Sequence, residues 1–196
     1  MMKEAGLEIG LPMFRLGHSV DGDWVEHVYP PVYRINEKGD RITATVPHGD
    51  PSIFKALALA SEPPHLLLYV LHTPRGEGEA GRYQSPELSN EAVADFIDKY
   101  AAFLRQDGRF DLWIHAPRAS TTIVWDRHNL LHAYGDAERF GKLLGELGYR
   151  VGEIVIPYPH EHHYHTELDD MAHGLLDDVD WYRTPLRPED EQRLDG

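Results

Sequence analysis

Four of the 13 histidines in this chain fall within six consecutive positions, in the sequence HEHHYH that starts at residue 160. Imidazole is the commonest metal ligand among protein side chains, and it titrates close to neutral pH. A cluster of this density therefore indicates either a metal site or a site of proton transfer. It does not by itself specify a reaction.

The backbone of this segment decides which histidines share a face. In an extended strand, His160 and His162 point to one side while His163 and His165 point to the other. In a helix, His162 and His165 share a face instead. Glu167 lies close enough in sequence to add a carboxylate. We therefore predict a divalent metal site formed by His160, His162, His165 and Glu167.

The chain contains no cysteine, which excludes both disulfide bonds and a thiolate zinc site. Imidazole and carboxylate ligands suit zinc, iron, manganese or nickel. If the protein is an enzyme, the simplest chemistry is attack of metal-activated water on a small polar substrate. Glu167 would then act as the fourth ligand or as the base.

Two known metal motifs resemble this segment in part. HEHHYH is similar to the H-x-H-x-D-H signature of the metallo-β-lactamase fold, but Tyr164 replaces the aspartate. Only 31 residues follow His165, too few for the rest of that site. The spacing of His160, His162 and Glu167 also resembles the first half of a cupin motif, which would make them a two-histidine, one-carboxylate triad. Cupins are all-β, whereas helical patterns precede this cluster, so we assign neither family.

The glycine string GEGEAG at residues 76–81 matches the G-x-G-x-x-G spacing of dinucleotide-binding loops. In that fingerprint the third glycine opens directly into a helix that faces the pyrophosphate. Here the next helical pattern starts near Asn90, and Glu77 and Glu79 would stand beside the phosphates. We therefore expect an acidic loop and no nucleotide cofactor.

The formal charge is −14, from 33 acidic and 19 basic residues. Such a charge opposes the counterion release that dominates nucleic-acid binding, so we expect neither nucleic acid nor an anionic membrane as a partner. No basic segment followed by an apolar stretch opens the sequence, and no apolar run reaches the length of a membrane span, which predicts a cytoplasmic protein.

A small acidic domain also suits a second class of function. It could be a non-catalytic interaction module that covers a basic surface on a partner, as immunity proteins and antitoxins do. A homodimer or a basic protein partner is the expected assembly, and the sequence leaves the choice between enzyme and module open.

Apolar periodicity predicts the elements that must position the histidines. Residues 24–46 read as a β-hairpin around a turn at 36–40, and Asp50 begins a short helix. Residues 65–71 form a continuous apolar run typical of a buried strand. Further strands are predicted at 111–115, 121–126, 130–134 and 153–156, and helices at 90–106 and 137–147.

This order of elements predicts an α+β fold with a mostly antiparallel sheet and two helices on one face. It is close to the split βαβ arrangement of ferredoxin-like domains, with an N-terminal β-hairpin extension. We expect one domain over residues 1–196, with the extension at 1–62, the core at 63–158, and the histidine-rich segment and acidic tail at 159–196. The topology would bring His65 and His132 toward the cluster. Most of the last ten residues should be mobile, with Trp181 as the tail's anchor.

Overall fold

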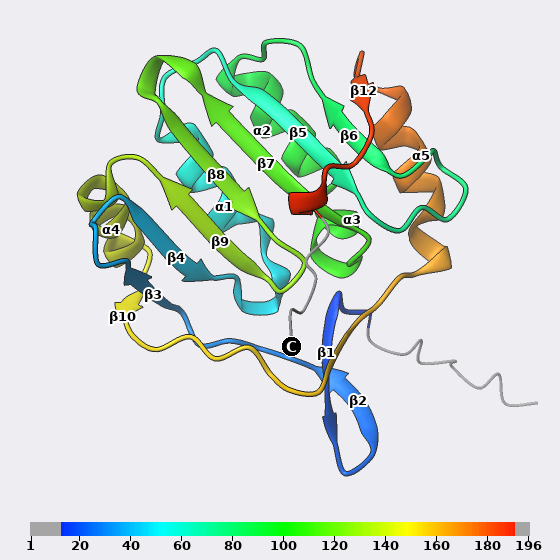
Figure 1. Cartoon of the computed structure of the whole chain (residues 1–196), viewed down its shortest axis with the longest axis horizontal. Coiled ribbons are helices and arrows are strands. Elements are labelled where there is room, and N and C mark those ends of the chain that lie inside the picture. The colour runs from blue at the N-terminus through cyan, green and yellow to red at the C-terminus, as the bar shows by residue number, and fades with distance from the viewer. Residues whose placement is uncertain (1–12, 191–196) are drawn as a thin grey trace, which may run out of the picture.

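The computed structural model describes residues 13–190, which form two sheets and five helices (Figure 1). The large sheet contains β3 (Val32–Ile35), β4 (Arg41–Thr45), β5 (Leu66–Leu71), β6 (Gly81–Gln84), β7 (Phe110–Ala116), β8 (Thr121–Trp125), β9 (Leu130–Tyr134), β10 (Arg150–Val151) and β12 (Tyr182–Thr184). The small sheet contains β1 (Leu16–Val20), β2 (Asp23–Glu26) and β11 (His160–His162). The helices are α1 (Pro51–Leu59), α2 (Asn90–Lys99), α3 (Ala101–Gln106), α4 (Ala137–Glu146) and α5 (Asp169–Asp177).

The strand order of the large sheet is β10-β3-β4-β9-β8-β7-β5-β6-β12, and every neighbouring pair except β10 and β3 is antiparallel. The predicted α+β class is therefore confirmed. This order does not establish the ferredoxin-like variant, because β5 and β7 are antiparallel neighbours and β7, β8 and β9 form a meander. The predicted hairpin forms from β3 and β4, and it belongs to the large sheet through the pairing of β4 with β9. The predicted domain boundaries stay a prediction.

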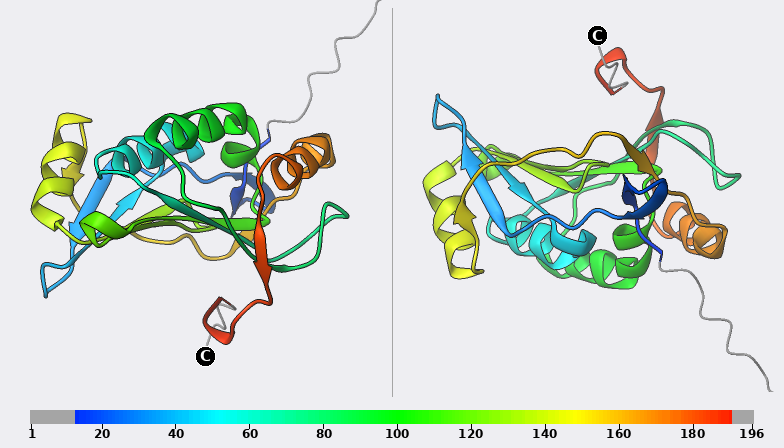
Figure 2. Two further views of the ribbon diagram at one scale, coloured as in Figure 1. Left: turned by 90° about the horizontal axis from the view of Figure 1, so that it is seen from above. Right: turned by 90° about the horizontal axis from the view of Figure 1, so that it is seen from below.

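Helices α1 to α4 lie on one face of the large sheet, and the segment that follows β12 lies on the other (Figure 2). Their buried side chains join inward-facing sheet residues in one hydrophobic core. The prediction that the helices near 90–106 and 137–147 pack on the same face is confirmed. None of the helices in residues 13–190 is long and apolar enough to cross a bilayer.

Three helices begin where the sequence places an N-cap. The side chains of Asp50, Ser89 and Asp136 accept hydrogen bonds from the first turns of α1, α2 and α4. Each cap satisfies a backbone N–H that has no partner inside the helix. The helix predicted over 90–106 is divided at Tyr100 into α2 and α3.

The strand predicted at residues 153–156 is wrong. The sheet ends at β10, and the chain then leaves it without strand pairing. Val155 and Ile156 are 65% and 42% exposed, whereas Ile154 packs on a small cluster formed by Leu16, Tyr29 and Leu130. Residues 153–156 therefore connect the large sheet to the small sheet, in which β11 and its histidines lie.

The guanidinium of Arg109 is buried and connects its own segment to two segments that are distant in the sequence. It forms ion pairs with Asp107 at 2.8 Å, with Glu77 at 3.0 Å and with Asp169 at 2.8 Å. Glu77 belongs to the glycine string, so a buried ion pair fixes part of the predicted acidic loop. Gly81 then begins β6 rather than a helix, so the dinucleotide fingerprint is not completed.

The acidic tail is more ordered than predicted. Leu175 of α5 is buried in the core, and its carbonyl accepts a hydrogen bond from Trp181 Nε1 at 3.0 Å, which confirms Trp181 as an anchor. Asp190 is also buried and pairs with Arg82 on β6. Of the last ten residues, most of which were predicted to be mobile, 187–190 are ordered against the protein, and 191–196 lie outside the described residues, so the prediction is not tested there.

We predict that Arg109→Met lowers the free energy of unfolding by about 3–5 kcal/mol at pH 7, because it leaves buried carboxylates without a counter-charge. Burial raises the pKa of Asp169, but hydrogen bonds from Arg109 and Arg75 outweigh burial and keep that pKa below its usual value. Such a group stabilises the native protein above about pH 4 and loses this contribution as the pH falls. In the variant, protonation instead relieves the uncompensated charge. Urea unfolding should therefore show a smaller difference between the two proteins at pH 4 than at pH 7.

Arg75→Met is the matched control, because Arg75 contacts the same Asp169 at 3.2 Å from a more exposed position. A surface ion pair contributes at most about 1 kcal/mol. Equal losses in the two variants, or a difference independent of pH, would contradict the role given to Arg109.

Candidate metal centre

Strand β11 decides which histidines face each other. It pairs with β1 in antiparallel register, with His160 opposite His18 and His162 opposite Leu16. The segment is therefore extended, and the rings of His160 and His162 lie on one side with centroids 5.6 Å apart. His163 stacks on His165 at 6.4 Å instead. Of the two backbone conformations that the sequence allows, the structure shows the extended one.

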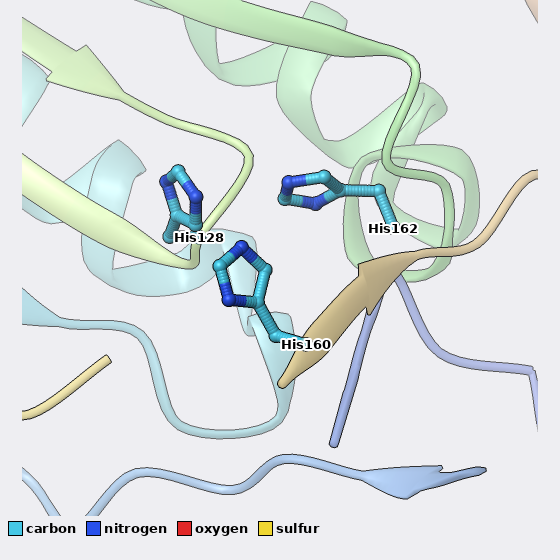
Figure 3. Close-up of side chains that lie close together, drawn as sticks. All are labelled: His128, His160 and His162. Atoms are coloured by element: carbon cyan, nitrogen blue, oxygen red, sulfur yellow. The ribbon is translucent and has the colours of Figure 1, made fainter. Parts of the chain in front are cut away.

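A third imidazole comes from a different part of the chain. His128 lies in the turn between β8 and β9, and its ring points toward those of His160 and His162 (Figure 3). Each residue offers one nitrogen, and these three atoms all lie within 4.8 Å of one another. All three side chains are partly buried, so the group is shielded but reachable.

The carboxylate of Asp126 fixes the turn that carries His128. Its Oδ1 accepts the backbone N–H of His128 at 2.9 Å and that of Leu130 at 3.0 Å. Its Oδ2 accepts Nε2–H of His132 at 3.1 Å and lies 3.7 Å from Nδ1 of His128. Burial raises the pKa of Asp126, but the contacts with His128 and His132 outweigh burial and hold it well below its usual value. Asp126 is therefore an anion beside the histidines.

Arg15 is buried next to this turn and contacts both Asp126 and Trp125. This fully buried guanidinium donates to the carbonyls of Leu104 at 3.0 Å, Phe110 at 3.1 Å and Asp126 at 3.3 Å. It also lies 4.8 Å from the ring centroid of Trp125. Burial lowers the pKa of Arg15 to about 10, which leaves it charged at neutral pH. One side chain thus joins β1, α3, β7 and the end of β8.

The imidazoles on β11 have lone pairs available for a cation. Nδ1–H of His160 donates to the carbonyl of Pro157 at 2.8 Å, so Nε2 carries the lone pair. Burial, followed by the neighbouring His128 and Arg127, lowers the pKa of His162 to about 3. His162 is therefore neutral at physiological pH. Its Nδ1 is buried without a hydrogen-bond partner among the described residues.

The structure separates the predicted ligand set into two parts. His160 and His162 belong to the cluster, whereas His165 points away and its Nε2 donates to the carbonyl of Phe14 at 3.0 Å. Glu167 is exposed, and its nearest partner is the hydroxyl of Thr166 at 3.2 Å. Neither residue is part of the three-histidine group.

His65 and His132, which the predicted topology brought toward the cluster, differ in their distance from it. His132 approaches the cluster through Asp126, which it shares with His128. His65 does not approach it. Its Nε2 lies 2.6 Å from Asn90 Oδ1, and the strand registers place it at the end of the sheet opposite the β8–β9 turn. The expected contact of His65 is absent because the strand predicted at 153–156 does not form, and β11, which carries His160 and His162, pairs with β1 in the small sheet.

Sequence reasoning missed His128 as a partner of the cluster. The strands predicted at 121–126 and 130–134 imply a turn at 127–129, but nothing in the spacing of its residues relates this turn to residues 160–165. The available signal was the carboxylate of Asp126 two positions earlier, since a histidine beside a carboxylate is a frequent arrangement behind metal ligands.

Three imidazole nitrogens within this distance could supply three of the four ligands of a tetrahedral ion. Three protein ligands leave one position of a tetrahedral ion open to water or substrate. Comparison with protein-family models, with curated proteins and with solved structures found no match. Functional conclusions therefore depend on this geometry.

We predict that Asp126→Ala lowers the free energy of unfolding by about 2–3 kcal/mol, since it removes the acceptor of two backbone donors and one imidazole. Asp136→Ala is the matched control, because it removes a single helix cap at a cost of about 1 kcal/mol. Urea unfolding of both variants checks the difference. If Asp126→Ala costs no more than the control, the carboxylate does not hold the turn.

Proposed function

We propose that this protein binds a divalent transition-metal ion through His128, His160 and His162. The observation that carries the proposal is the convergence of three imidazole nitrogens from two separate elements within 4.8 Å. A set of imidazoles favours zinc, copper, iron or nickel over calcium or magnesium, which prefer oxygen ligands. Zinc fits best, because a tetrahedral ion needs only one more ligand.

The surroundings of the three histidines support this assignment. A metal-bound imidazole usually donates its second N–H to a carbonyl or carboxylate, which fixes the ring orientation. The carbonyl of Pro157 does this for His160 at 2.8 Å. Asp126 Oδ2 lies 3.7 Å from Nδ1 of His128 and is placed to do the same with a small shift. The lowered pKa of His162 removes proton competition at that ligand.

The open fourth position suits hydrolysis of a small polar substrate. A metal ion with three imidazole ligands lowers the pKa of its bound water to about 7, which supplies hydroxide at neutral pH. If the three imidazoles hold such an ion, the activated water would form a C–O bond to a carbonyl carbon, and the bond to the leaving group would break as the leaving group took the proton of that water. Asp126 would stabilise the positive charge that builds on His128.

We predict that protein purified without an affinity tag binds about one zinc ion per chain, and that His128→Ala weakens this binding by at least about 100-fold, because two imidazoles hold zinc much less firmly than three. Calorimetric titration of the metal-free protein measures the affinity. His165→Ala should change it by less than about threefold, because His165 lies on the other side of β11 and donates to Phe14.

These two variants distinguish the three-histidine site of the structure, which includes His128, from the site predicted from the sequence, which includes His165. A larger loss for His165→Ala than for His128→Ala would return the site to residues 160–167. No zinc binding by the native chain would refute the metal proposal and favour the interaction module.

We predict that zinc-loaded protein hydrolyses 4-nitrophenyl acetate faster than metal-free protein, with a rate that rises with pH through the ionisation of bound water near pH 7. Release of nitrophenolate, followed by absorbance, measures the rate. His162→Ala should remove the zinc-dependent part. If zinc binds tightly and the rate does not change, the site is not hydrolytic towards this ester.

A further inference from the structure

Strand β2 lies at one edge of the small sheet. The strand order is β11-β1-β2, so one side of β2 pairs with β1 and the other side pairs with no strand of residues 13–190. Asp21 and Gly22 form the turn between β1 and β2 with φ angles of 52° and 93°, as a tight two-residue hairpin requires. In Figure 1 the turn of this hairpin projects beyond the large sheet and the helices.

The direction of the backbone groups along β2 follows from one hydrogen bond. The N–H of His27 donates to the carbonyl of Leu16 at 2.9 Å, so the backbone of His27 points toward β1. Because this direction alternates along an antiparallel strand, the N–H and C=O groups of Trp24 and Glu26 point away from β1. The outer edge therefore presents donors and acceptors to which a further strand can bind.

The side chains of this edge are apolar and acidic. Trp24 and Val25 are 41% and 38% exposed, and large apolar residues on an open edge strand mark a site where another chain can pair. Asp23 and Glu26 flank them, and the sequence contains no lysine or arginine from residue 16 to residue 31. The edge therefore has the order acidic, apolar, apolar, acidic.

A second copy of the chain is a poor match for this edge. Pairing two β2 strands brings the carboxylates of Asp23 and Glu26 from both copies together without a lysine or arginine in either hairpin, and like charges on paired strands are destabilising. Each chain also carries a formal charge of −14, which adds to the repulsion. Glu26 Oε1 lies 3.3 Å from Nδ1 of His48, and both side chains are partly exposed to solvent. Charge complementarity therefore favours a basic partner.

We infer that β2 binds an extended segment of a partner protein in which two basic residues flank two apolar residues. This segment adds to the edge as an antiparallel strand, and its backbone pairs with that of Trp24 and Glu26. Its basic side chains lie opposite Asp23 and Glu26, and its apolar side chains lie opposite Trp24 and Val25. The interface requires no metal ion, so it goes beyond the proposed function.

NMR titration of the isotopically labelled, metal-free full chain with a capped peptide of sequence TKVVKT tests the inference. A capped peptide of sequence TEVVET is the control, because it keeps the apolar pair and reverses the charge. TKVVKT should bind at least about tenfold more tightly than TEVVET. At saturating peptide, the amide hydrogens of Trp24 and Glu26 should exchange more slowly with solvent, whereas that of Val25, which already points toward β1, should not change.

Two sets of variants separate the contribution of the backbone from that of the charges. Trp24→Ala and Trp24→Pro both remove the ring, but only proline removes the outward N–H, so Trp24→Pro should bind TKVVKT several-fold more weakly than Trp24→Ala. The double variant Asp23→Asn, Glu26→Gln should bind the two peptides with equal affinity. The double variant Glu37→Gln, Glu62→Gln, which removes two exposed carboxylates elsewhere, should keep the preference for TKVVKT.

Thermal unfolding identifies any variant that has lost its fold, and the double variant of Asp23 and Glu26 decides the matter if Trp24→Pro does not fold. Equal affinity of the native chain for the two peptides, no binding of TKVVKT, a preference that survives the loss of both carboxylates, or equal binding by Trp24→Ala and Trp24→Pro would each overturn the inference.

Sedimentation of the native chain without peptide tests the other occupant of this edge. The chain should sediment as a monomer. A dimer that Trp24→Pro dissociates would assign the edge to a second copy of this chain and would overturn the inference as well. None of these measurements depends on zinc, so their failure is distinct from failure of the proposed function.

Discussion

The buried carboxylate of Asp126 is the interaction on which this architecture depends. A buried anion must be fully satisfied, and here the satisfying donors are the backbone of the β8–β9 turn and the imidazole of His132. Arg15 binds the carbonyl of the same residue and ties it to β1. The carboxylate of Asp126 therefore sets the position of His128, and the backbone carbonyl of the same residue connects this turn to the small sheet through Arg15.

Local signals in the sequence were sufficient for most of the elements. Caps such as Asp50 and Asp136 act within one helical turn, so their effect is visible without the fold. The failure at residues 153–156 has a non-local cause. Whether Ile154 and Val155 form a strand depends on a free sheet edge beside them, and the chain crosses instead to β1.

In the candidate site, too, some features follow from local sequence signals and others depend on contacts between distant segments. The alternation of a strand explains why His160 and His162 lie together while His163 and His165 face away, and spacing predicted this arrangement for an extended segment, beside the helical alternative. The third imidazole could not follow from spacing, because the approach of residue 128 to β11 is set by the pairing of β11 with a strand from the other end of the chain. Arg15 gave no sequence signal, since an isolated arginine before an apolar strand normally faces solvent.

The pairing of β1, which ends at Val20, with β11, which begins at His160, joins segments that are far apart in the sequence. During synthesis, β1 leaves the ribosome first and must wait for its partner until nearly all the other residues have emerged. Closing so long a loop is slow, so the small sheet should be the last part to assemble. Until then, the run of histidines at 160–165 is a flexible chelator with no geometric selectivity. The geometry of the proposed metal site is thus completed only at the end of folding.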